Sequence, residues 1–238
     1  RAVGDVHVGA DILPTTNYES NIGSFTKKFL SLHAAELNVE TIVASERRST
    51  IGGRLNVGLG NILASDLSTS ATTLYVKHNN LNVNDILHFE KDGSVEFMKV
   101  TASNGGSAGN YSYSVTRNLD GSSANAWSAG DSLINTGTTG NAFLDIYSLN
   151  SLKTGVSTNG ATIAYMERTG TTYNDIDSRA IVGNLKGWYG YTSNVYGAGF
   201  GDYSNENLVI DATNGLRIRS GSNVALEANS GILKVGNN

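Results

Sequence analysis

The sequence predicts an all-β fold built from many short strands joined by turns. Glycine is abundant among the 238 residues, with 28, and proline occurs once. Runs in which apolar and polar residues alternate recur along the chain, and an eight-residue repeat occupies its last part. Both patterns are typical of strands with one buried and one exposed face. No stretch shows a sustained helical period, so helix should account for well under the usual third of the residues.

Charge and composition exclude several classes of protein. The net charge of −4 and the pI near 5.5 give no broad positive surface for nucleic acid. The chain has no cysteine, so it has neither a disulfide framework nor a thiolate metal site, and we expect no cofactor. No apolar run approaches the ~18 residues of a membrane-inserted helix. Because the sequence starts at Arg1 and shows no signal peptide, we expect a processed or truncated chain.

Residues 1–60 are expected to form an N-terminal, shaft-like β segment. Thr26–Leu32 is long enough for one or two helical turns, but β-rich pairs follow it. Short elements are expected at Val3–Val8, at the turn Pro14–Asn17, and at Leu37–Val39, Thr41–Val43 and Arg54–Gly58.

Residues 61–136 predict a small antiparallel β-domain, either a barrel or a sandwich. Asp92-Gly93 lies between two alternating runs and is a strong marker of a tight hairpin. Asn104–Asn110 is rich in glycine and predicts a second, looser hairpin. The expected core residues are Leu74, Val76, Ile86, Leu87, Phe97, Val100, Val115 and Leu133.

Residues 137–206 predict a β region rich in glycine and aromatic residues. Between Gly183 and Tyr203, aromatic side chains alternate closely with glycines. Such rings suit sugar binding by stacking, but they also suit a core between chains where glycine lets backbones approach. We favour the core, and keep as possible glycan contacts Trp188, Tyr189, Tyr191, Tyr196 and Tyr203.

Residues 207–238 carry the eight-residue repeat and predict a C-terminal shaft. One apolar series is spaced by eight residues: Leu208, Leu216, Val224 and Ile232. A second series follows two residues later at Ile210, Ile218 and Leu226, and Lys234 ends it. Four strand residues and four turn residues make one repeat, with apolar side chains on one face of each strand.

The repeat segment is too small to fold alone. Ordering the backbone costs about 1–2 kcal/mol per residue, whereas two buried apolar side chains per strand return roughly 3–6 kcal/mol. Other chains must therefore supply the rest of the core, and three copies forming a triangular prism would do so. The alternative is a meander packed on the chain's own body. The expected architecture is thus an elongated, intertwined homotrimer with short β-prism or triple β-helix-like shaft segments and the small β-domain.

Several segments resemble bacteriophage tail fibres and related virion proteins. Ile22-Gly23-Ser24 and Phe29–His33 occupy the places of a pattern that marks a chain entering a trimeric shaft, with Phe29 in place of the usual Trp and His33 in place of Tyr. The run "RNLDGSSANAWSAGDSLINTG", from Arg117 to Gly137, is similar to the end of a small β-domain common in these proteins. "ERTGTTYNDIDSRAIVGNLKGWYGY" and "IDATNGLRIRSGSNV" also resemble fibre segments.

This resemblance implies a structural protein of the virion tail, a fibre or tail-tip component that displays adhesion domains for host attachment. It implies a homotrimer that contacts other tail or baseplate proteins and a host surface glycan. Two alternatives stay open: a tailspike-type polysaccharide depolymerase, and a subunit of a non-viral extracellular filament or adhesin.

The patterns of enzymes and metal sites are weak here, and we expect no enzymatic activity. Gly105–Gly109 fits G-x-S-x-G, but Ser107 lies in a hairpin loop with no helix after it. The four histidines, His7, His33, His78 and His88, share no metal-ligand spacing. Asp175 and Asp177 lie near Glu167 and Arg179 and form the best candidate for a carboxylate pair, although such a run is usually a solvated turn. Asp202 and Glu206 suggest calcium only weakly, because no EF-hand-like loop surrounds them.

Overall fold

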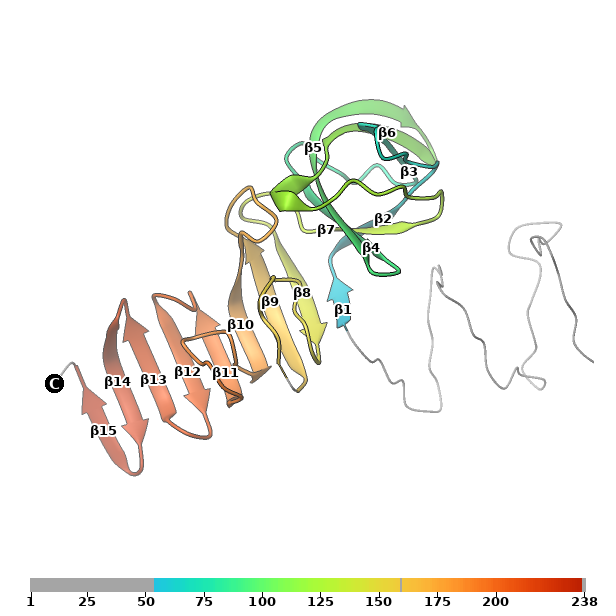
Figure 1. The fold of residues 1–238 in the computed structure, drawn as a ribbon. Coiled ribbons are helices and arrows are strands. Elements are labelled where there is room, and N and C mark those ends of the chain that lie inside the picture. Colours follow the sequence, from blue (N-terminus) through green and yellow to red (C-terminus); the bar gives the residue numbers. More distant parts are fainter. Residues whose placement is uncertain (1–53, 159, 237–238) are drawn as a thin grey trace, which may run out of the picture. The chain divides into compact units, whose positions relative to one another are not determined.

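The computed structural model describes residues 54–158 and 160–236, and it confirms the all-β prediction (Figure 1). In these ranges the chain forms strands β1 to β15 and one short 3₁₀ helix, η1 (Leu119–Gly121). No helix there has the length and apolar character needed to cross a membrane. The N-terminal expectations lie outside the described residues, except for Arg54–Gly58, where β1 (Arg54–Val57) is found.

The strands form two antiparallel sheets. The six-stranded sheet has the spatial order β2 (Leu59–Ile62), β7 (Ser132–Asn135), β4 (Ile86–Lys91), β5 (Ser94–Ser107), β6 (Asn110–Thr116) and β3 (Thr73–Val76). The nine-stranded sheet has the order β1, β8 (Ala142–Tyr147), β9 (Thr162–Arg168), β10 (Ile176–Asn184), β11 (Tyr196–Gly201), β12 (Asn207–Asp211), β13 (Gly215–Ser220), β14 (Asn223–Asn229) and β15 (Ile232–Val235).

The six-stranded sheet curls into a half-barrel whose strands run from Leu59 to Asn135. A bridge between Leu63 and Val76 brings its two edges together. The predicted hairpin turn is present between β4 and β5, where Asp92 and Gly93 have φ values of 50° and 80°. Positive φ at both positions is what a two-residue turn matched to the strand twist requires. The second hairpin is tighter than predicted, because β5 continues to Ser107, which pairs with Asn110.

The predicted core of the half-barrel is correct at six of eight positions. The confirmed residues, all at most 4 % exposed, are Leu74, Val76, Leu87, Val100, Val115 and Leu133. Ile86 is 0 % exposed but lies outside this core, because it is on the same side of β4 as His88. The prediction is wrong for Phe97. Strand β5 directs Glu96 and Met98 toward the core, so Phe97 points to the other face. Hydrophobicity favoured the phenylalanine, but strand alternation places a carboxylate in the core.

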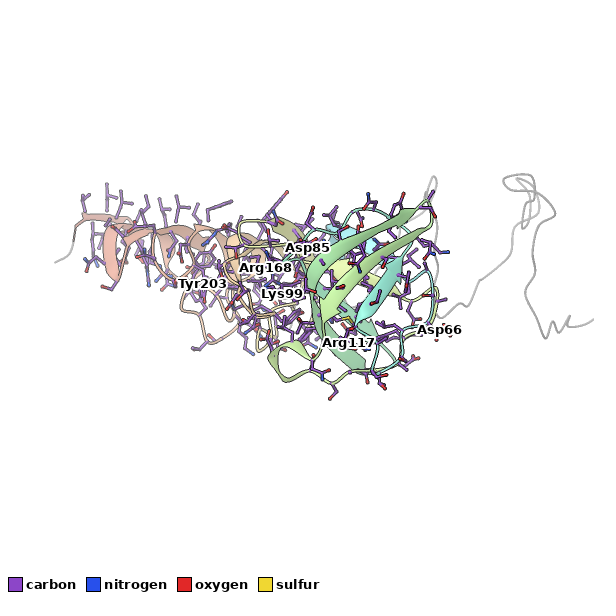
Figure 2. All side chains as sticks on the ribbon, turned by 90° about the horizontal axis from the view of Figure 1, so that it is seen from above. Asp66, Asp85, Lys99, Arg117, Arg168 and Tyr203 are labelled. Carbon is purple, nitrogen blue, oxygen red and sulfur yellow. The ribbon has the colours of Figure 1, made fainter. Side chains whose placement is uncertain are left out.

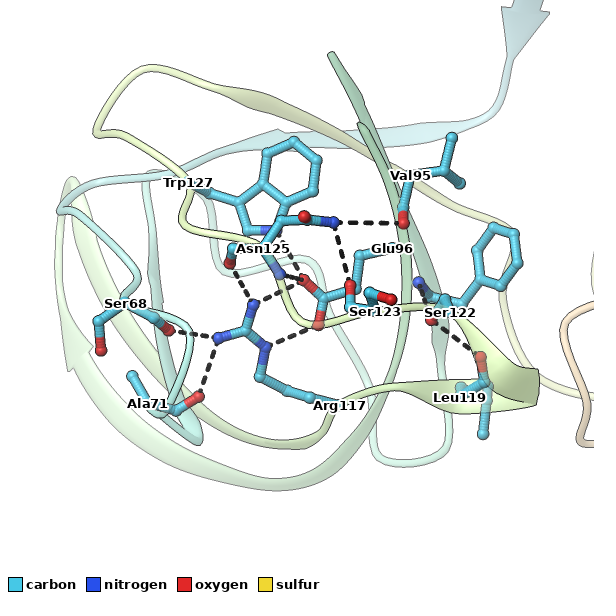
Figure 3. Close-up of polar contacts among 11 residues, drawn as sticks. Ser68, Ala71, Val95, Glu96, Arg117, Leu119, Ser122, Ser123, Asn125 and Trp127 are labelled. Atoms are coloured by element: carbon cyan, nitrogen blue, oxygen red, sulfur yellow. Dashed lines mark hydrogen bonds and ion pairs between the residues drawn. The ribbon is translucent and has the colours of Figure 1, made fainter. Parts of the chain in front are cut away.

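The buried Glu96 is neutralised by Arg117 (Figure 3). Arg117 Nε and Nη2 donate to the two carboxylate oxygens of Glu96 at 2.7 and 2.6 Å. The indole N–H of Trp127 donates to Glu96 Oε2 at 2.8 Å, and the backbone N–H of Asn125 donates to the same oxygen at 3.0 Å. The Arg117 guanidinium also donates to the carbonyl oxygens of Ser68, Ala71 and Asn125. The run Arg117–Gly137 therefore contributes Arg117, Asn125 and Trp127 to a structural network of this fold.

The half-barrel is inserted between two neighbouring strands of the nine-stranded sheet. The chain leaves that sheet at Val57, completes the half-barrel and returns as β8, which pairs with β1. Regions 137–206 and 207–238, which the sequence separated, contribute to one continuous sheet, because β12 pairs with β11.

The last residue of β9 and the loop between β9 and β10 connect the two sheets. The ring of Tyr173 stacks on Phe97 with centroids 3.5 Å apart and planes inclined by 3°. The backbone N–H of Tyr173 donates to the carboxylate of Asp120 in η1. Arg168, which is fully buried, donates to Thr136 Oγ1 at 2.5 Å and to the carbonyl of Thr172 at 2.6 Å.

One face of the nine-stranded sheet is covered by the chain's own connecting segments. Asp145 accepts hydrogen bonds from Ser151 Oγ and the Leu152 N–H at 2.7 and 2.9 Å, which fastens the segment after β8. Figure 2 shows the covering segments gathered on one side of the sheet. The second core lies beneath them and consists of Phe143, Tyr147, Leu152, Val156, Ala164, Met166, Ile176, Ile181, Leu185, Trp188, Tyr189 and Val209.

Replacing Arg117 by methionine should destabilise the protein strongly. The Arg117→Met variant keeps the apolar stem but leaves Glu96 as a buried, unpaired charge, which costs about 3–5 kcal/mol. Urea denaturation followed by tryptophan fluorescence measures the change. Arg179→Met is the control, since the Arg179–Glu167 pair is partly exposed and such a pair is worth at most ~1 kcal/mol. Equal losses in the two variants would contradict the assigned role of the Glu96 network.

Candidate functional site: an uncovered apolar face

The face of the nine-stranded sheet opposite the covering segments carries two uninterrupted rows of apolar residues. Directly paired residues in neighbouring antiparallel strands point to the same side, so the strand register defines each row. Row 1 consists of Val57, Leu144, Tyr165, Ala180, Phe200, Leu208, Ile218, Leu226 and Val235. Row 2 consists of Leu55, Ile146, Ile163, Val182, Ala198, Ile210, Leu216, Ala228 and Leu233.

Each row crosses all nine strands without a polar residue, although only 39 % of the whole sequence is apolar. Nine large side chains of the rows are 39–76 % exposed: Leu55, Val57, Ile163, Tyr165, Val182, Phe200, Ile210, Leu233 and Val235. Tyr196, which lies outside the rows, is 51 % exposed and is on the same side of β11 as Phe200. Together the row side chains present on the order of 900 Å² of apolar surface, against ~300–600 Å² for the largest patch on a typical monomer.

Two bulges keep the rows free of polar residues. Ser178 pairs with Met166 and Ala180 with Tyr165, so Arg179 is the extra residue between them. Without the bulge Arg179 would oppose Tyr165 and interrupt row 1. A second irregularity, at Ile218/Arg219, lets Leu226 oppose Ile218 although Val224 opposes Arg219.

The eight-residue repeat is a strand-and-turn unit of this sheet. Strands β12 to β15 form an antiparallel meander, and Leu208, Ile210, Leu216 and Ile218 lie in the rows as the repeat predicts. The last two repeats deviate. Val224 pairs with Arg219 and not with a row residue. Ile232 pairs with Asn229, next to the pair Ala228–Leu233, and so points to the opposite face. In β13 to β15 no side chain is fully buried: those of β13 and β14 are mostly half-buried and those of β15 are exposed.

The aromatic tract divides between the two faces of the sheet. Trp188 and Tyr189 are 0 % and 3 % exposed and belong to the intrachain core, and Tyr191 and Tyr203 pack against that core. The Trp188 indole N–H donates to Tyr147 Oη at 3.1 Å. A Cβ atom at position 199 would lie 2.3 Å from the Tyr189 ring, so Gly199 permits this packing. Tyr196, by contrast, is 51 % exposed. Glycan contact by these rings stays a prediction, and the intact core offers no surface of Trp188 for it.

The candidate carboxylate pair is engaged in structural contacts. Asp177 forms an ion pair with Lys153 at 2.7 Å, and Arg179 Nε donates to Glu167. Asp175 Oδ2 accepts the Thr172 backbone N–H at 2.8 Å, and this hydrogen bond lowers the pKa of Asp175.

The remaining sequence candidates are also accounted for by local contacts. Asp202 accepts from the backbone N–H and hydroxyl of Ser204, and Glu206 accepts from Ser220 Oγ and the Gly221 N–H. Within residues 54–158 and 160–236, no group of three or more His, Asp or Glu side chains could hold a metal ion. Ser107 ends β5 at a hairpin turn and is followed by β6, so the nucleophile-elbow geometry is missing there.

The functional features missed at the sequence level are the row residues of β1 and β8 to β11 and the buried His88. A signal for the rows was present in "AFLDIY", where Phe143 and Tyr147 alternate with Leu144 and Ile146, so both faces of the strand are apolar. A strand that is apolar on both faces predicts cover on both sides.

His88 is a buried histidine held neutral by its surroundings. It lies in β4 and is 4 % exposed, and its ring makes edge contacts with Phe97 and Tyr173. Burial lowers the pKa of His88 to about 4; the carboxylate of Glu90 opposes this shift and Arg54 adds to it.

The buried neutral His88 should make stability fall on acidification. Between pH 6.5 and about 4 the unfolded chain binds a proton at this residue and the folded chain does not. Wild-type stability should therefore lose about 2 kcal/mol between pH 7 and pH 5, at ~1.36 kcal/mol per pKa unit. His88→Asn should lack this loss.

Urea denaturation at pH 7, 6 and 5 measures this dependence. His78→Asn is the control, since the His78 side chain is exposed. The same pH dependence in wild type and His88→Asn would show that His88 is not the group responsible.

Comparison of the chain with protein-family models and with curated protein sequences returned no match. The likeness to tail fibres is therefore carried by the motif residues quoted above. The uncovered apolar face is independent of that likeness, because it follows from strand register and exposure alone.

Proposed function

We propose that the protein is a homotrimeric structural component of a phage tail, a fibre or tail-tip protein whose subunits meet through the two apolar rows. The single observation that carries the trimer is the pair of apolar rows across all nine strands. Apolar surface of on the order of 900 Å² per chain matches the ~800 Å² that each partner contributes to a standard interface.

A second copy of this chain is the best-matched cover for the face. The rows cross nine strands at ~4.8 Å spacing, so a partner must offer an apolar strip of on the order of 40 Å. Another copy offers a strip of the same length and character. Closed symmetric homo-oligomers are also the commonest soluble assemblies.

Three copies suit the narrowness of the strip better than two. The rows are two side chains wide, whereas β13 and β14 have six and seven residues. In a two-layered sandwich the broad faces of the sheets oppose each other, and wider apolar rows would be expected. Three narrow strips around a threefold axis form a triangular core in which two inward side chains per strand suffice.

The half-barrel is well placed to be the domain that such an assembly presents at its surface. It has its own hydrophobic core and enters and leaves the sheet through adjacent strands β1 and β8. A domain inserted in this way can vary its surface without disturbing the rows. Together with the fibre-like motifs, this arrangement supports a rigid tail protein that presents a domain for host attachment, at the virion tail and without enzymatic activity.

A charge in the rows should dissociate the trimer. Light scattering of the wild type should give about three times the 25.1 kDa chain mass. Val182→Asp brings a carboxylate from each chain into the apolar core, where an unpaired charge is costly, so monomers should appear. Val83→Asp is a matched control, because Val83 is 47 % and Val182 52 % exposed and only Val182 lies in a row.

A folded wild-type monomer of 25.1 kDa would refute the trimer. The virion role has a separate test, peptide sequencing of tail particles purified from the source culture. Recovery of this chain from virions would support the role, and recovery from a cell-envelope fraction alone would favour a cellular adhesin.

A further inference from the structure

The uncovered face of the nine-stranded sheet has two different margins beside its apolar rows. Strand alternation places the residues two positions outside each row on the same side of the sheet as the rows. The margin next to row 1, called the charged border, carries Glu167, Asp202 and Glu206. The margin next to row 2, called the neutral border, carries Ala161, Tyr196 and Ala212.

Arg179 is a cation held by its edge at the charged border. As the bulge residue of β10 it stands outside the ladder, and its Nε donates to Glu167 while Nη1 lies 3.6 Å from Asp202 Oδ2. Because the N–H bonds of a guanidinium lie in its plane, such contacts occupy its edge and leave its flat faces available for stacking. The side chain is 36 % exposed, so a partner can reach it.

Tyr196 presents an aromatic ring at the neutral border. A Cβ atom at position 160 would lie 2.4 Å from Tyr196 Oη and 3.0 Å from Tyr196 Cε1, so Gly160 lets the ring lie against the segment before β9. The residue is nevertheless 51 % exposed. One side of the ring therefore contacts its own chain, and the other side is open to a partner.

The Tyr196 ring and the Arg179 guanidinium cannot meet within one chain. Strand β11 begins at Tyr196, and Asp202 follows its last residue, so the two borders are separated by roughly 20 Å of strand at ~3.3 Å per residue. Row residues Ala198 and Phe200 lie between them. An aromatic face attracts a guanidinium only within ~6 Å of the ring centroid. A second copy of the chain can therefore bring the two groups together, and the chain's own fold cannot.

We propose that the Tyr196 ring of each copy stacks on the Arg179 guanidinium of the next copy at each corner of the trimer. This contact rests on the proposed function, because it forms when the apolar rows close around a threefold axis. Around such an axis every strand lies at the height of the same strand in its neighbours, and the neutral border of one copy meets the charged border of the next. Arg179 in β10 is then one strand spacing, ~4.8 Å, from the level of Tyr196 in β11. Two different borders in contact give a heterologous interface, which closes into a ring.

Cysteine cross-linking tests the corner contact on the full chain, which has no cysteine of its own. The double variant Tyr196→Cys/Arg179→Cys is treated with a short bismaleimide, because the long native side chains hold the Cα atoms farther apart than the ~7 Å limit of a disulfide. A denaturing gel should show covalent dimer and trimer. Each single variant should give only monomer, because every corner brings together one residue of each kind. Cross-linking in a single variant, or products of the double variant that stop at the dimer, would overturn the contact.

Substitutions at Tyr196 test whether the ring face matters. A cation–π contact at an exposed site changes an equilibrium constant about two- to fivefold, so three contacts change the trimer dissociation constant on the order of 10- to 100-fold. Analytical ultracentrifugation in moderate urea should show this weakening for Tyr196→Leu and none for Tyr196→Phe, which keeps the ring. Tyr75→Leu is the control, since Tyr75 is 39 % exposed and lies in β3 of the half-barrel.

The same comparison in an Arg179→Met background isolates the cation. There the Leu and Phe variants of Tyr196 should dissociate alike, because the guanidinium is gone. An equal difference between these two variants with and without Arg179 would refute stacking on the guanidinium.

The corner contact and the trimer fail in different ways. If the wild type scatters light as a trimer but the double cysteine variant does not cross-link, the trimer stands and the corner contact is wrong. A wild-type monomer of 25.1 kDa would refute the trimer and the corner contact together.

Discussion

The structure depends on one constraint: an antiparallel sheet of nine strands must keep two apolar rows in register along its whole width. In a strand, a slip by one residue moves every side chain to the opposite face. The rows therefore survive only if each of eight successive pairings is correct. Two irregularities help to keep the pairings correct. The bulge at Arg179 leaves this residue outside the ladder, and the register shift at Ile218/Arg219 keeps Leu226 opposite Ile218. Both act where an unbroken ladder would place a wrong residue on the apolar face.

The two faces of this sheet have different tasks. One face is completed within the chain, where the segments after β8 and β10 bring Leu152, Trp188 and Tyr189 over the strands. The other face has no cover among the described residues and is where we propose that further copies pack. Toward β13 to β15 the intrachain cover ends: most side chains of β13 and β14 are half-buried on both sides, and those of β15 are exposed. This part of the sheet has the greatest need of a partner.

Buried polar groups determine how the half-barrel is built and attached. Glu96 and Arg117 neutralise each other inside it, and Arg168 joins Thr136 of the half-barrel to the loop after β9. A buried charge without such partners would cost several kcal/mol, so these contacts specify a geometry as much as they stabilise it. The same junction positions Tyr173, whose hydroxyl oxygen lies 3.2 Å from His88 Nδ1.

The sequence by itself determined the local features of this protein. Alternation and turn residues predicted the all-β class, the hairpin at Asp92-Gly93 and most of the half-barrel core, because these depend on neighbours close in the chain. The tertiary structure decided the rest. Glu96 and not Phe97 lies in the core, because Arg117 neutralises the carboxylate and Trp127 donates a hydrogen bond to it, and both are distant from Glu96 in the sequence. The two rows depend on the pairing of β1 with β8, which lie far apart in the chain, and on two bulges in the pairings of consecutive strands. No local pattern specifies which distant strands will pair or where a bulge will shift their register.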